Sequence, residues 1–473
     1  MSDNSEKKVS PFGIKDKLGY MFGDFGNDFT FIFASSYLMV FYTKVLGING
    51  AAVGFLFLAA RLVDAFTDVT MGRIVDTARP AKDGRFRPWI RRMCIPVAIA
   101  SSLMYLYFVR DWPYAGKMAY MIITYILWGS IFYTSINIPY GSMASVISSD
   151  PAERASLSTF RSIGASLAGL AIGILVPLYL YTEDAGGNQI VIPENFTYIA
   201  LVFSALAVIC YVLCYRLCRE RVHIPPKSSG HTMPVGTMLS GLFTNRALLA
   251  IIGSALLLLL ATLLSQNMNN FLFMDYFRNA KILAVVSVIS MGGVLLVAPF
   301  AVSISKRIGK KEAGSIGALI AAIAYFVLFF IRTRSLGVFI ALMFIGSIGI
   351  GFFNMIVWAY ITDVIDYQEI RTGQREDGTV YAVYSFSRKL GQALAGGVGG
   401  FALTAIGYIS EAPSQTQQVA DNIYSVSTLV PAVCYLGVFL IMFFGYPLSK
   451  KAVEENTAVL NRRREENAAK ENN

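Results

Sequence analysis

The second long apolar segment of this chain contains the stretch Arg61-Leu62-Val63-Asp64-Ala65-Phe66-Thr67-Asp68. Three of its side chains would be charged in water, although apolar sequence flanks them on both sides. A charge near the centre of a bilayer costs at least about 2.5–3.5 kcal/mol, so such residues are rare and usually mark an ion or substrate path. On a helix, Asp64, Thr67 and Asp68 would project from one face. We interpret them as a site for a small cation or a shared proton, with a structural ion pair to Arg61 as the alternative.

The composition places this stretch in a membrane protein. Of the 473 residues, 55% are hydrophobic and 15% are charged, and the mean hydropathy is +0.55. A soluble protein of this length would carry about 25% charged residues. Apolar runs of about 20 residues recur along the chain, and each is long enough to cross a bilayer. We therefore predict an all-α polytopic membrane protein.

The net charge of +10 is concentrated in alternate loops. Lysines and arginines gather in the ranges 79–92, 216–227 and 306–311, whereas the ranges 182–198 and 408–424 contain neither. This asymmetry follows the positive-inside rule, and it predicts a multi-pass protein of the bacterial plasma membrane with both termini in the cytoplasm. A nucleic-acid-binding protein would instead need a basic patch on a soluble face, so that class is not favoured.

Both histidines, His223 and His231, lie in a polar stretch rather than in an apolar segment. An enzyme would need an activated nucleophile or a metal site among the buried residues. The sequence therefore predicts no enzyme, no cofactor and no metal beyond a possible coupling sodium ion.

Twelve apolar segments are divided into two sets of six by the polar stretch 219–245. Its proline, serine and charged residues are typical of a cytoplasmic linker. The basic loop after the second segment has a counterpart after the eighth, within the range 305–311. Two related six-helix bundles of this kind form the major facilitator arrangement. We predict a tail, a bundle, the linker, a second bundle and a second tail, with the bounds 1–19, 20–218, 219–245, 246–448 and 449–473.

Several polar and charged residues interrupt the apolar segments. They are Asp28, Tyr133, Thr134, Asn137, Arg161, Ser385, Arg388 and Lys389. Inside a bilayer such charges must pair with one another or line a wet cavity. Their mixture suits a polyhydroxylated ligand, because Asp28 can accept from two hydroxyls while Arg161 and Lys389 donate. The alternative for each residue is a hydrogen bond that only joins two helices.

At these residues the chain resembles the glycoside–pentoside–hexuronide:cation symporters, the major facilitator group of the melibiose and glucuronide permeases. The resemblance covers residues 15–450. Its most specific pieces are Phe25-Gly26-Asn27-Asp28-Phe29, Asp64-Ala65-Phe66-Thr67-Asp68, Gly84-Arg85-Phe86-Arg87-Pro88-Trp89, Asn137-Ile138-Pro139-Tyr140, Thr362-Asp363-Val364-Ile365-Asp366-Tyr367 and Ser387-Arg388-Lys389-Leu390-Gly391-Gln392.

The resemblance implies symport of a sugar with a cation by alternating access. It implies a cation site made of Asp64, Thr67, Asp68 and Thr134. It implies substrate contacts from Asp28, Tyr133, Asn137, Arg161, Ser385 and Lys389. We expect gating or structural ion pairs at Arg61, Asp76, Arg85 and Arg388. The expected partners are a small sugar, a coupling cation and the lipid bilayer, and we expect the monomer to be functional.

Three positions depart from the pattern of the melibiose permease. Asn27 replaces a lysine, Asn137 replaces a sugar-binding aspartate and Gly141 replaces a tryptophan. Sodium-coupled members commonly carry asparagine where this chain has Thr67. The sequence therefore leaves both sodium and the proton open as the coupling ion.

The substrate class is indicated by the balance of charge. The lost carboxylate at Asn137 and the adjacent Arg388 and Lys389 favour a sugar acid, and the range 358–408 is most similar to the glucuronide permeases. The retained Asp28 favours a neutral glycoside instead. A glucuronide or other hexuronide is the first prediction, ahead of a neutral glycoside. The alternative functions are an uncoupled sugar uniporter and a proton-driven exporter of small polar solutes.

Overall fold

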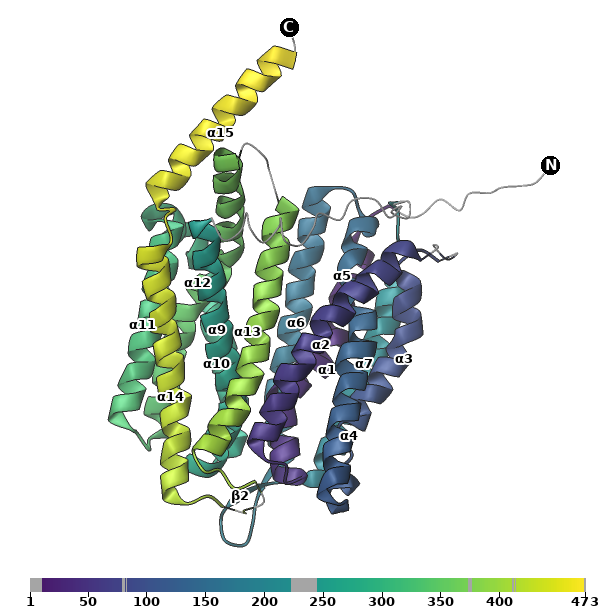
Figure 1. The fold of residues 1–473 in the computed structure, drawn as a ribbon, viewed down its shortest axis with the longest axis vertical. Coiled ribbons are helices and arrows are strands. Elements are labelled where there is room, and N and C mark those ends of the chain that lie inside the picture. Colours follow the sequence, from purple (N-terminus) through teal and green to yellow (C-terminus); the bar gives the residue numbers. More distant parts are fainter. Residues whose placement is uncertain are drawn as a thin grey trace, which may run out of the picture. The chain divides into compact units, whose positions relative to one another are not determined.

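The computed structural model of the chain describes residues 11–78, 81, 83–222, 245–372, 377–410, 412 and 414–471. Almost all of these residues are helical, as Figure 1 shows. The chain divides into two compact units. The first is Met1–Gly230 with Ile409–Ser414, and the second is His231–Tyr408 with Gln415–Asn473.

The described residues of the first unit form six long helical segments. They are α1 (Ile14–Val40) with its π-helical turn η1 (Phe41–Val45), α2 (Gly50–Thr77), α3 (Arg87–Leu103) with the short helix η2 (Tyr107–Asp111), α4 (Tyr114–Ile126) continued by η3 (Leu127–Tyr133) and α5 (Thr134–Ile147), α6 (Pro151–Leu180) and α7 (Pro193–Leu217). A small antiparallel hairpin joins the last two helices. Its strands β1 (Tyr181–Glu183) and β2 (Gln189–Val191) pair Tyr181 with Val191.

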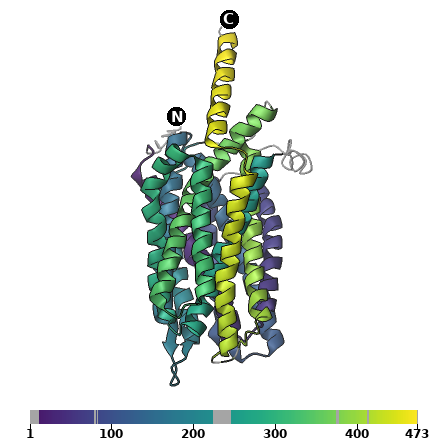
Figure 2. The same ribbon diagram turned by 90° about the vertical axis from the view of Figure 1, so that its left-hand side faces the viewer.

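The described residues of the second unit also form six long segments and one further helix. The long segments are α9 (Arg246–Phe271) with η4 (Leu272–Tyr276), α10 (Leu283–Ile308) preceded by η5 (Ala280–Ile282), α11 (Lys310–Ile331), α12 (Leu336–Thr372), α13 (Asp377–Ala405) and α14 (Gln417–Leu440) with η6 (Ile441–Gly445). The further helix, α15 (Lys450–Glu471), contacts α12 and projects beyond the end of α14 in Figure 2.

The helices have the length and composition that a bilayer requires. Within the described residues, nine segments are long and apolar enough to cross a membrane. The other three long segments are α1, which carries Asp24 and Asp28, and α10 and α13, which overlap the shorter apolar stretches Ala280–Gly293 and Leu390–Ala405. The prediction of an all-α polytopic protein with two six-helix bundles is thereby confirmed. The residues predicted to form the linker lie mostly outside the described ones, so the exact domain bounds stay a prediction.

Both units pair their helices in the same order. In the first unit α1 packs against α6 and α7, α3 packs against α5 and α7, and α2 packs against α5. In the second unit α9 packs against α13 and α14, α11 against α12 and α14, and α10 against α12. Each helix of one unit therefore has a counterpart in the other. This is the pattern that an internal repeat produces in secondary transporters.

Close packing of α1 on α7 depends on small residues. A Cβ atom at Gly19 would lie 2.8 Å from the Cys218 Sγ atom, and one at Gly26 would lie 3.1 Å from the Ala207 carbonyl oxygen. Larger side chains at these positions would push the two helices apart, as at other small-residue contacts between membrane helices. The glycines therefore fix how α1 presents the acidic residues that lie between and beyond them.

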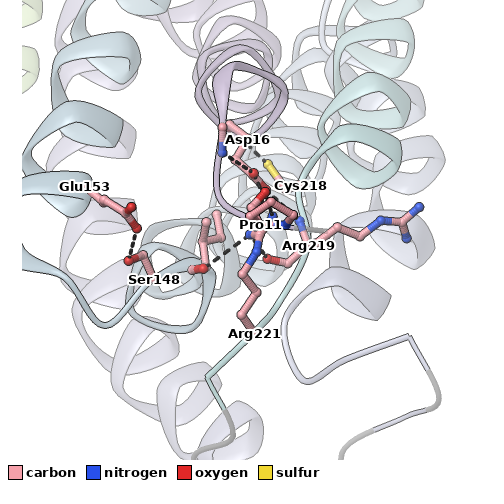
Figure 3. Close-up of polar contacts among 9 residues, drawn as sticks. Pro11, Asp16, Ser148, Glu153, Cys218, Arg219 and Arg221 are labelled. Carbon is pink, nitrogen blue, oxygen red and sulfur yellow. Dashed lines mark hydrogen bonds and ion pairs between the residues drawn. The ribbon is translucent and has the colours of Figure 1, made fainter. Parts of the chain in front are cut away.

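A buried ion pair ties the beginning of α1 to the segment that follows α7. The Asp16 side chain is only 3% exposed, and its Oδ2 atom lies 2.8 Å from an Arg221 guanidinium nitrogen. The Asp16 Oδ1 atom also accepts from the backbone N–H of Arg219 at 3.1 Å, and the backbone N–H of Arg221 donates to the Val146 carbonyl at 2.7 Å. Figure 3 shows Arg221 reaching towards Asp16 at this junction. The chain leaving α7 is thus fastened to the start of α1 and the end of α5.

The basic loop before α3 closes on one carboxylate of the same unit. Glu220 Oε2 accepts the backbone N–H of Arg85 at 2.7 Å, and Glu220 Oε1 accepts those of Phe86 at 2.9 Å and Arg87 at 2.8 Å. These N–H groups belong to the start of α3, where they have no partner within the helix. The Arg85 side chain, predicted to form a gating ion pair, donates from Nε to the Val75 carbonyl at 3.3 Å. The side chain of Asp76, its expected neighbour, lies outside the described residues.

A neighbouring carboxylate strengthens this loop. Asp83 accepts a hydrogen bond from the Tyr215 hydroxyl at 2.8 Å and lies 3.4 Å from an Arg91 guanidinium nitrogen. Partial burial raises the pKa of Asp83, but the Tyr215 hydrogen bond, with Arg91 and Arg87, outweighs it and lowers the pKa below its usual range. The ionised form is therefore the one that the folded loop favours.

The counterpart loop of the second unit is also fastened within its own bundle. Lys310, at the start of α11, places its Nζ atom 2.6 Å from Asp363 Oδ1 on α12, and its carbonyl accepts from the Tyr360 hydroxyl at 2.7 Å. The two basic loops that resemble each other in sequence therefore have a shared structural role. Each joins the start of its unit's third long helix to another helix of the same unit.

We expect the change Glu220→Gln to lower the free energy of unfolding by about 1–2 kcal/mol, because an amide accepts the three backbone N–H groups less strongly than a carboxylate does. Thermal unfolding of the purified protein in detergent measures this change. Glu455→Gln is the matched control, because Glu455 is 65% exposed and lies 3.9 Å from Lys451 in an exposed pair. Equal melting temperatures for the two variants would contradict the role given to Glu220.

Candidate functional site

An ion pair lies midway along α1. Asp24 lies about 15 Å along the helix axis from Ile14, the first residue of α1. Its Oδ1 atom lies 2.8 Å from the Arg161 Nε atom of α6. The Arg161 guanidinium also lies over the Tyr140 ring, 5.3 Å from its centroid. The Tyr140 hydroxyl in turn donates to the Tyr20 carbonyl at 2.7 Å. Arg161 is therefore fixed from α1 and from α5.

Asp28 lies one helical turn beyond Asp24 on the same face of α1. Among the described residues, no hydrogen bond or ion pair holds its carboxylate. The charged groups that interact with it electrostatically are Asp24 and Arg161. This neighbourhood thus holds two carboxylates for one guanidinium, and the guanidinium is held by the first of them.

Two further predicted substrate residues lie beside this pair on η3 and α5. The Tyr133 ring stacks with Phe31 at 5.6 Å and packs on Trp128 at 5.4 Å, measured between centroids. Its hydroxyl interacts electrostatically with both Asp24 and Asp28. The structure therefore brings the aromatic ring and the two carboxylates into one neighbourhood.

Asn137 takes part in a chain of amide hydrogen bonds. Its Oδ1 atom accepts from Asn27 Nδ2 at 3.4 Å, and Asn27 Oδ1 accepts from the Tyr211 hydroxyl of α7 at 2.8 Å. Asn27 and Asn137 are two of the three departures noted in the sequence. They contact each other, so the two departures concern one interaction.

The predicted cation site lies where α2 faces η3 and α5. Asp68 Oδ1 accepts a hydrogen bond from the Thr134 hydroxyl at 3.0 Å. Asp64 Oδ1 accepts one from the Ser130 hydroxyl at 2.5 Å. Both carboxylates of α2 are therefore held from the neighbouring segment by hydroxyl groups. Ser130 was not predicted, because an isolated serine in an apolar segment gives no signal of its own.

Thr67, the fourth residue of the predicted site, and the nearby Arg61 both contact residues of their own helix. Arg61 lies 3.2 Å from Asp64 Oδ2, and its guanidinium lies over the Phe31 ring at 5.5 Å. The Thr67 hydroxyl donates to the backbone carbonyl of Asp64 at 3.2 Å. The structural ion pair offered as an alternative for Arg61 is thus present. A hydroxyl oxygen that donates its hydrogen still has lone pairs to offer, so Thr67 stays in the predicted cation site.

Three predicted residues lie on α13 of the second unit. Arg388 is exposed on α13. The side chains of Ser385 and Lys389 lie outside the described residues, so their assignment stays a prediction. Within the described part of the chain, no group of three or more histidine, cysteine or acidic residues is arranged to hold a metal ion.

The main residue that the sequence reasoning left out of the site is Asp24. The sequence puts it four residues before Asp28, on the same helix face, but Arg161 was assigned to the substrate alone. The structure gives Arg161 a resident carboxylate. A signal existed, since an arginine inside an apolar segment needs an internal counter-ion whenever no ligand is bound.

Comparison with known proteins identifies the family of the chain. The family model described as MFS/sugar transport protein matches residues 19–450. An uncharacterized symporter of Bacillus subtilis, YjmB, is 32% identical over 95% of this chain and 95% of its own length. A protein of Escherichia coli named glucuronide carrier protein homolog is 32% identical over 94% of this chain and 95% of its own length.

The fold is also that of solved transporters. The crystal structure of a D-xylose–proton symporter matches with a TM-score of 0.63 at 12% identity, covering 92% of this chain and 97% of that one. Both the family model and the relatives are transporters rather than enzymes. The chain is therefore a multi-pass membrane transporter for small molecules, and it belongs to the MFS/sugar transport family.

Proposed function

We propose that this protein is a symporter that imports a sugar acid, a glucuronide or other hexuronide, together with a sodium ion or a proton. The observation that carries the proposal is the Arg161–Asp24 pair with Asp28 beside it, midway along otherwise apolar helices. Charges at that depth are retained where they act on a substrate or an ion. The name of the Escherichia coli relative supports the substrate class.

The groups of the first unit match the parts of a sugar acid. The Arg161 side chain is 42% exposed while that of Asp24 is 8% exposed, so the guanidinium remains accessible beside its buried partner. A guanidinium binds a carboxylate with two parallel hydrogen bonds. Asp28 accepts from sugar hydroxyls, and the Tyr133 ring offers an apolar surface to the sugar ring. Ser385 and Lys389 of α13 are proposed to add contacts from the second unit.

The proposed coupling site is the pair of carboxylates on α2 with the hydroxyls that hold them. Binding of one cation at Asp68 and Thr134, beside Asp64 and Thr67, neutralises charge next to the sugar site and favours sugar binding. The coupling is reciprocal, so sugar raises the affinity for the cation by the same factor. A singly charged sugar acid carried with one cation crosses without net charge and gains nothing from the membrane potential.

We also propose the orientation and the state of assembly. The basic ranges of the sequence favour a cytoplasmic location for both termini. The Asp16–Arg221 junction at the start of α1 and the loop around Glu220 would then lie on the cytoplasmic side. The monomer suffices in this proposal, because the residues assigned to sugar and cation come from one chain.

The change Asp68→Asn should abolish uphill accumulation while leaving sugar exchange, because the amide cannot carry the charge that couples cation to sugar. Uptake of a labelled glucuronide into proteoliposomes under an imposed ion gradient measures accumulation. Asp111→Asn is the control, because Asp111 is 77% exposed and lies 3.7 Å from Arg110 in an exposed pair. Normal accumulation by the Asp68 variant would reject the coupling site.

The change Ser130→Ala should identify the coupling ion. If the ion is sodium, losing the hydroxyl that holds Asp64 raises the sodium concentration for half-maximal uptake about tenfold, since a hydrogen bond to a charged group is worth about 1.5–3 kcal/mol. If the ion is a proton, the same loss changes the dependence of uptake on pH instead of on sodium. Ser135→Ala is the control, because the Ser135 hydroxyl donates to the Ile131 carbonyl of its own helical segment. A variant that changes neither dependence would remove Ser130 from the coupling site.

The change Asp28→Ala should abolish sugar binding while the cation site stays intact. Direct binding of labelled glucuronide to the purified protein measures the first, and cation-dependent protection against thermal unfolding measures the second. Asp111→Ala again serves as the exposed control. Unchanged sugar affinity would show that the substrate binds elsewhere.

The alternative functions are separated by one transport experiment. A relative from Salmonella typhimurium is named a putative 2,3-dihydroxypropane-1-sulfonate exporter, which favours export of a small acid as the second candidate. Oriented vesicles loaded with glucuronide, galactoside or a three-carbon sulfonate, under separate sodium and proton gradients, distinguish the cases. A symporter accumulates substrate with the gradient, an exporter expels it, and a uniporter responds to neither ion.

A further inference from the structure

The Arg161–Asp24 pair has a charge balance that a sugar acid would disturb. Asp24 is the carboxylate that holds Arg161, at 2.8 Å, and Asp28 adds a second negative charge. A substrate carboxylate at Arg161 would be a third. Three negative charges around one guanidinium inside a membrane helix bundle are strongly unfavourable, so at least one carboxylate has to be neutralised as the substrate binds.

The groups around Asp24 offer it no second cation. It faces Tyr20 and Asp28 on its own helix, and Arg161 on α6. The hydroxyls of Tyr140 on α5, Tyr133 on η3 and Tyr211 on α7 also interact with it electrostatically. Among these described residues, Arg161 is the one positive group that acts on Asp24. When Arg161 turns to another carboxylate, these neighbours leave Asp24 with neutral hydroxyls and Asp28.

We infer that Asp24 is the resident counter-ion of Arg161, that the carboxylate of a sugar acid replaces it there, and that the displaced Asp24 takes up a proton. This inference rests on the proposed function and adds a proton to it that is distinct from the coupling ion at Asp68. It also makes Asp24 a specificity-determining residue, since a neutral glycoside would leave the pair in place.

The exchange conserves hydrogen bonds and charge. The bond from Arg161 Nε to Asp24 Oδ1 breaks, and Arg161 donates instead to the carboxylate of the substrate. A proton from solution binds the Asp24 carboxylate, so the net charge of the site is unchanged by the arrival of the anion. Release of the sugar acid reverses each step, because Asp24 loses its proton and returns to Arg161. The Asp24 carboxylate thereby competes with the substrate for Arg161, which keeps release of a tightly bound anion from becoming too slow for transport.

The geometry distinguishes Asp24 from Asp28 in this role. No hydrogen bond or ion pair among the described residues joins Asp28 to Arg161, so Asp28 has no bond to exchange when the substrate arrives. Arg161 is also anchored over the Tyr140 ring at 5.3 Å, so it keeps its place when Asp24 leaves. The Arg161 side chain is 42% exposed beside the 8% exposed Asp24, which gives the substrate a side from which to approach.

Proton uptake on substrate binding tests the inference. The purified protein in a weakly buffered solution is titrated with p-nitrophenyl β-D-glucuronide and, separately, with p-nitrophenyl β-D-glucoside, which has a hydroxymethyl group in place of the carboxylate. The wild-type protein should take up about one proton more per bound glucuronide than per bound glucoside. Any proton taken up at Asp68 is common to both ligands and cancels in this difference.

The variant Asp24→Asn assigns the proton to its residue. It should bind the glucuronide at least as tightly as the wild type, with the extra proton lost and with affinity that no longer weakens as the pH rises. Asp24→Glu keeps a carboxylate and should restore the extra proton. Asp111→Asn, at the exposed site used above, should behave as the wild type.

Two outcomes overturn the inference, and a third overturns the proposed function with it. Equal proton uptake for the two ligands in the wild-type protein rejects the exchange, and this holds even if the Asp24 variants do not fold. Weaker glucuronide binding by Asp24→Asn with an unchanged pH dependence would reduce Asp24 to a structural support of Arg161. A wild-type protein that binds the glucoside or other ligands but no sugar acid rejects the proposed substrate class, and the exchange falls with it.

Discussion

The constraint on which the first unit depends is the cost of placing charge inside a membrane helix. The Arg161–Asp24 pair meets that cost by joining α6 to α1 at 2.8 Å, and the Tyr140 ring covers the guanidinium. Each remaining charge in such a place must pair with another group or face a water-filled cavity. Among the described residues, no hydrogen bond or ion pair holds the Asp28 carboxylate. Our proposal therefore places the polar substrate beside Asp28.

The surrounding packing explains why these charges keep their positions. Glycines let α1 lie against α7, and the Asp16–Arg221 pair fastens the beginning of the same helix. At the start of α3 the carboxylate of Glu220 takes up three backbone N–H groups. Each six-helix unit is thus held by contacts inside itself, and the equivalent Lys310–Asp363 pair does the same in the second unit. Such internal contacts are what the proposed alternating access requires, because it moves each unit as a body.

The sequence predicted the fold class, and it singled out the residues proposed for the site, because a charged residue inside an apolar segment is costly and therefore conspicuous. An aspartate in an apolar segment is conspicuous, and spacing of four residues on a helix puts Asp64 with Asp68 and Asp24 with Asp28. Partners far apart in the chain give no such signal. Glu220 accepts hydrogen bonds from the loop before α3, which lies more than 130 residues earlier in the chain. The sequence does not distinguish Ser130 from the other serines, and only the structure shows its hydrogen bond to Asp64 of α2. The sequence did not identify Asp24 as the partner of Arg161 for the same reason, because the two residues lie 137 positions apart in the chain.

The contact between Asn27 and Asn137 changes the argument for an acidic substrate. In the melibiose permease pattern these positions carry a lysine and an aspartate, so the chain has lost one charge of each sign. The two amides now bond to each other and to Tyr211. The loss of the aspartate therefore does not make the site more positive, since the lysine is lost with it. The proposed preference for a sugar acid therefore rests on Arg161 and on the exchange of its counter-ion Asp24 that we infer. A neutral pair of amides is compatible with that exchange, because a lysine at Asn27 would compete with Arg161 for the incoming carboxylate and an aspartate at Asn137 would repel it.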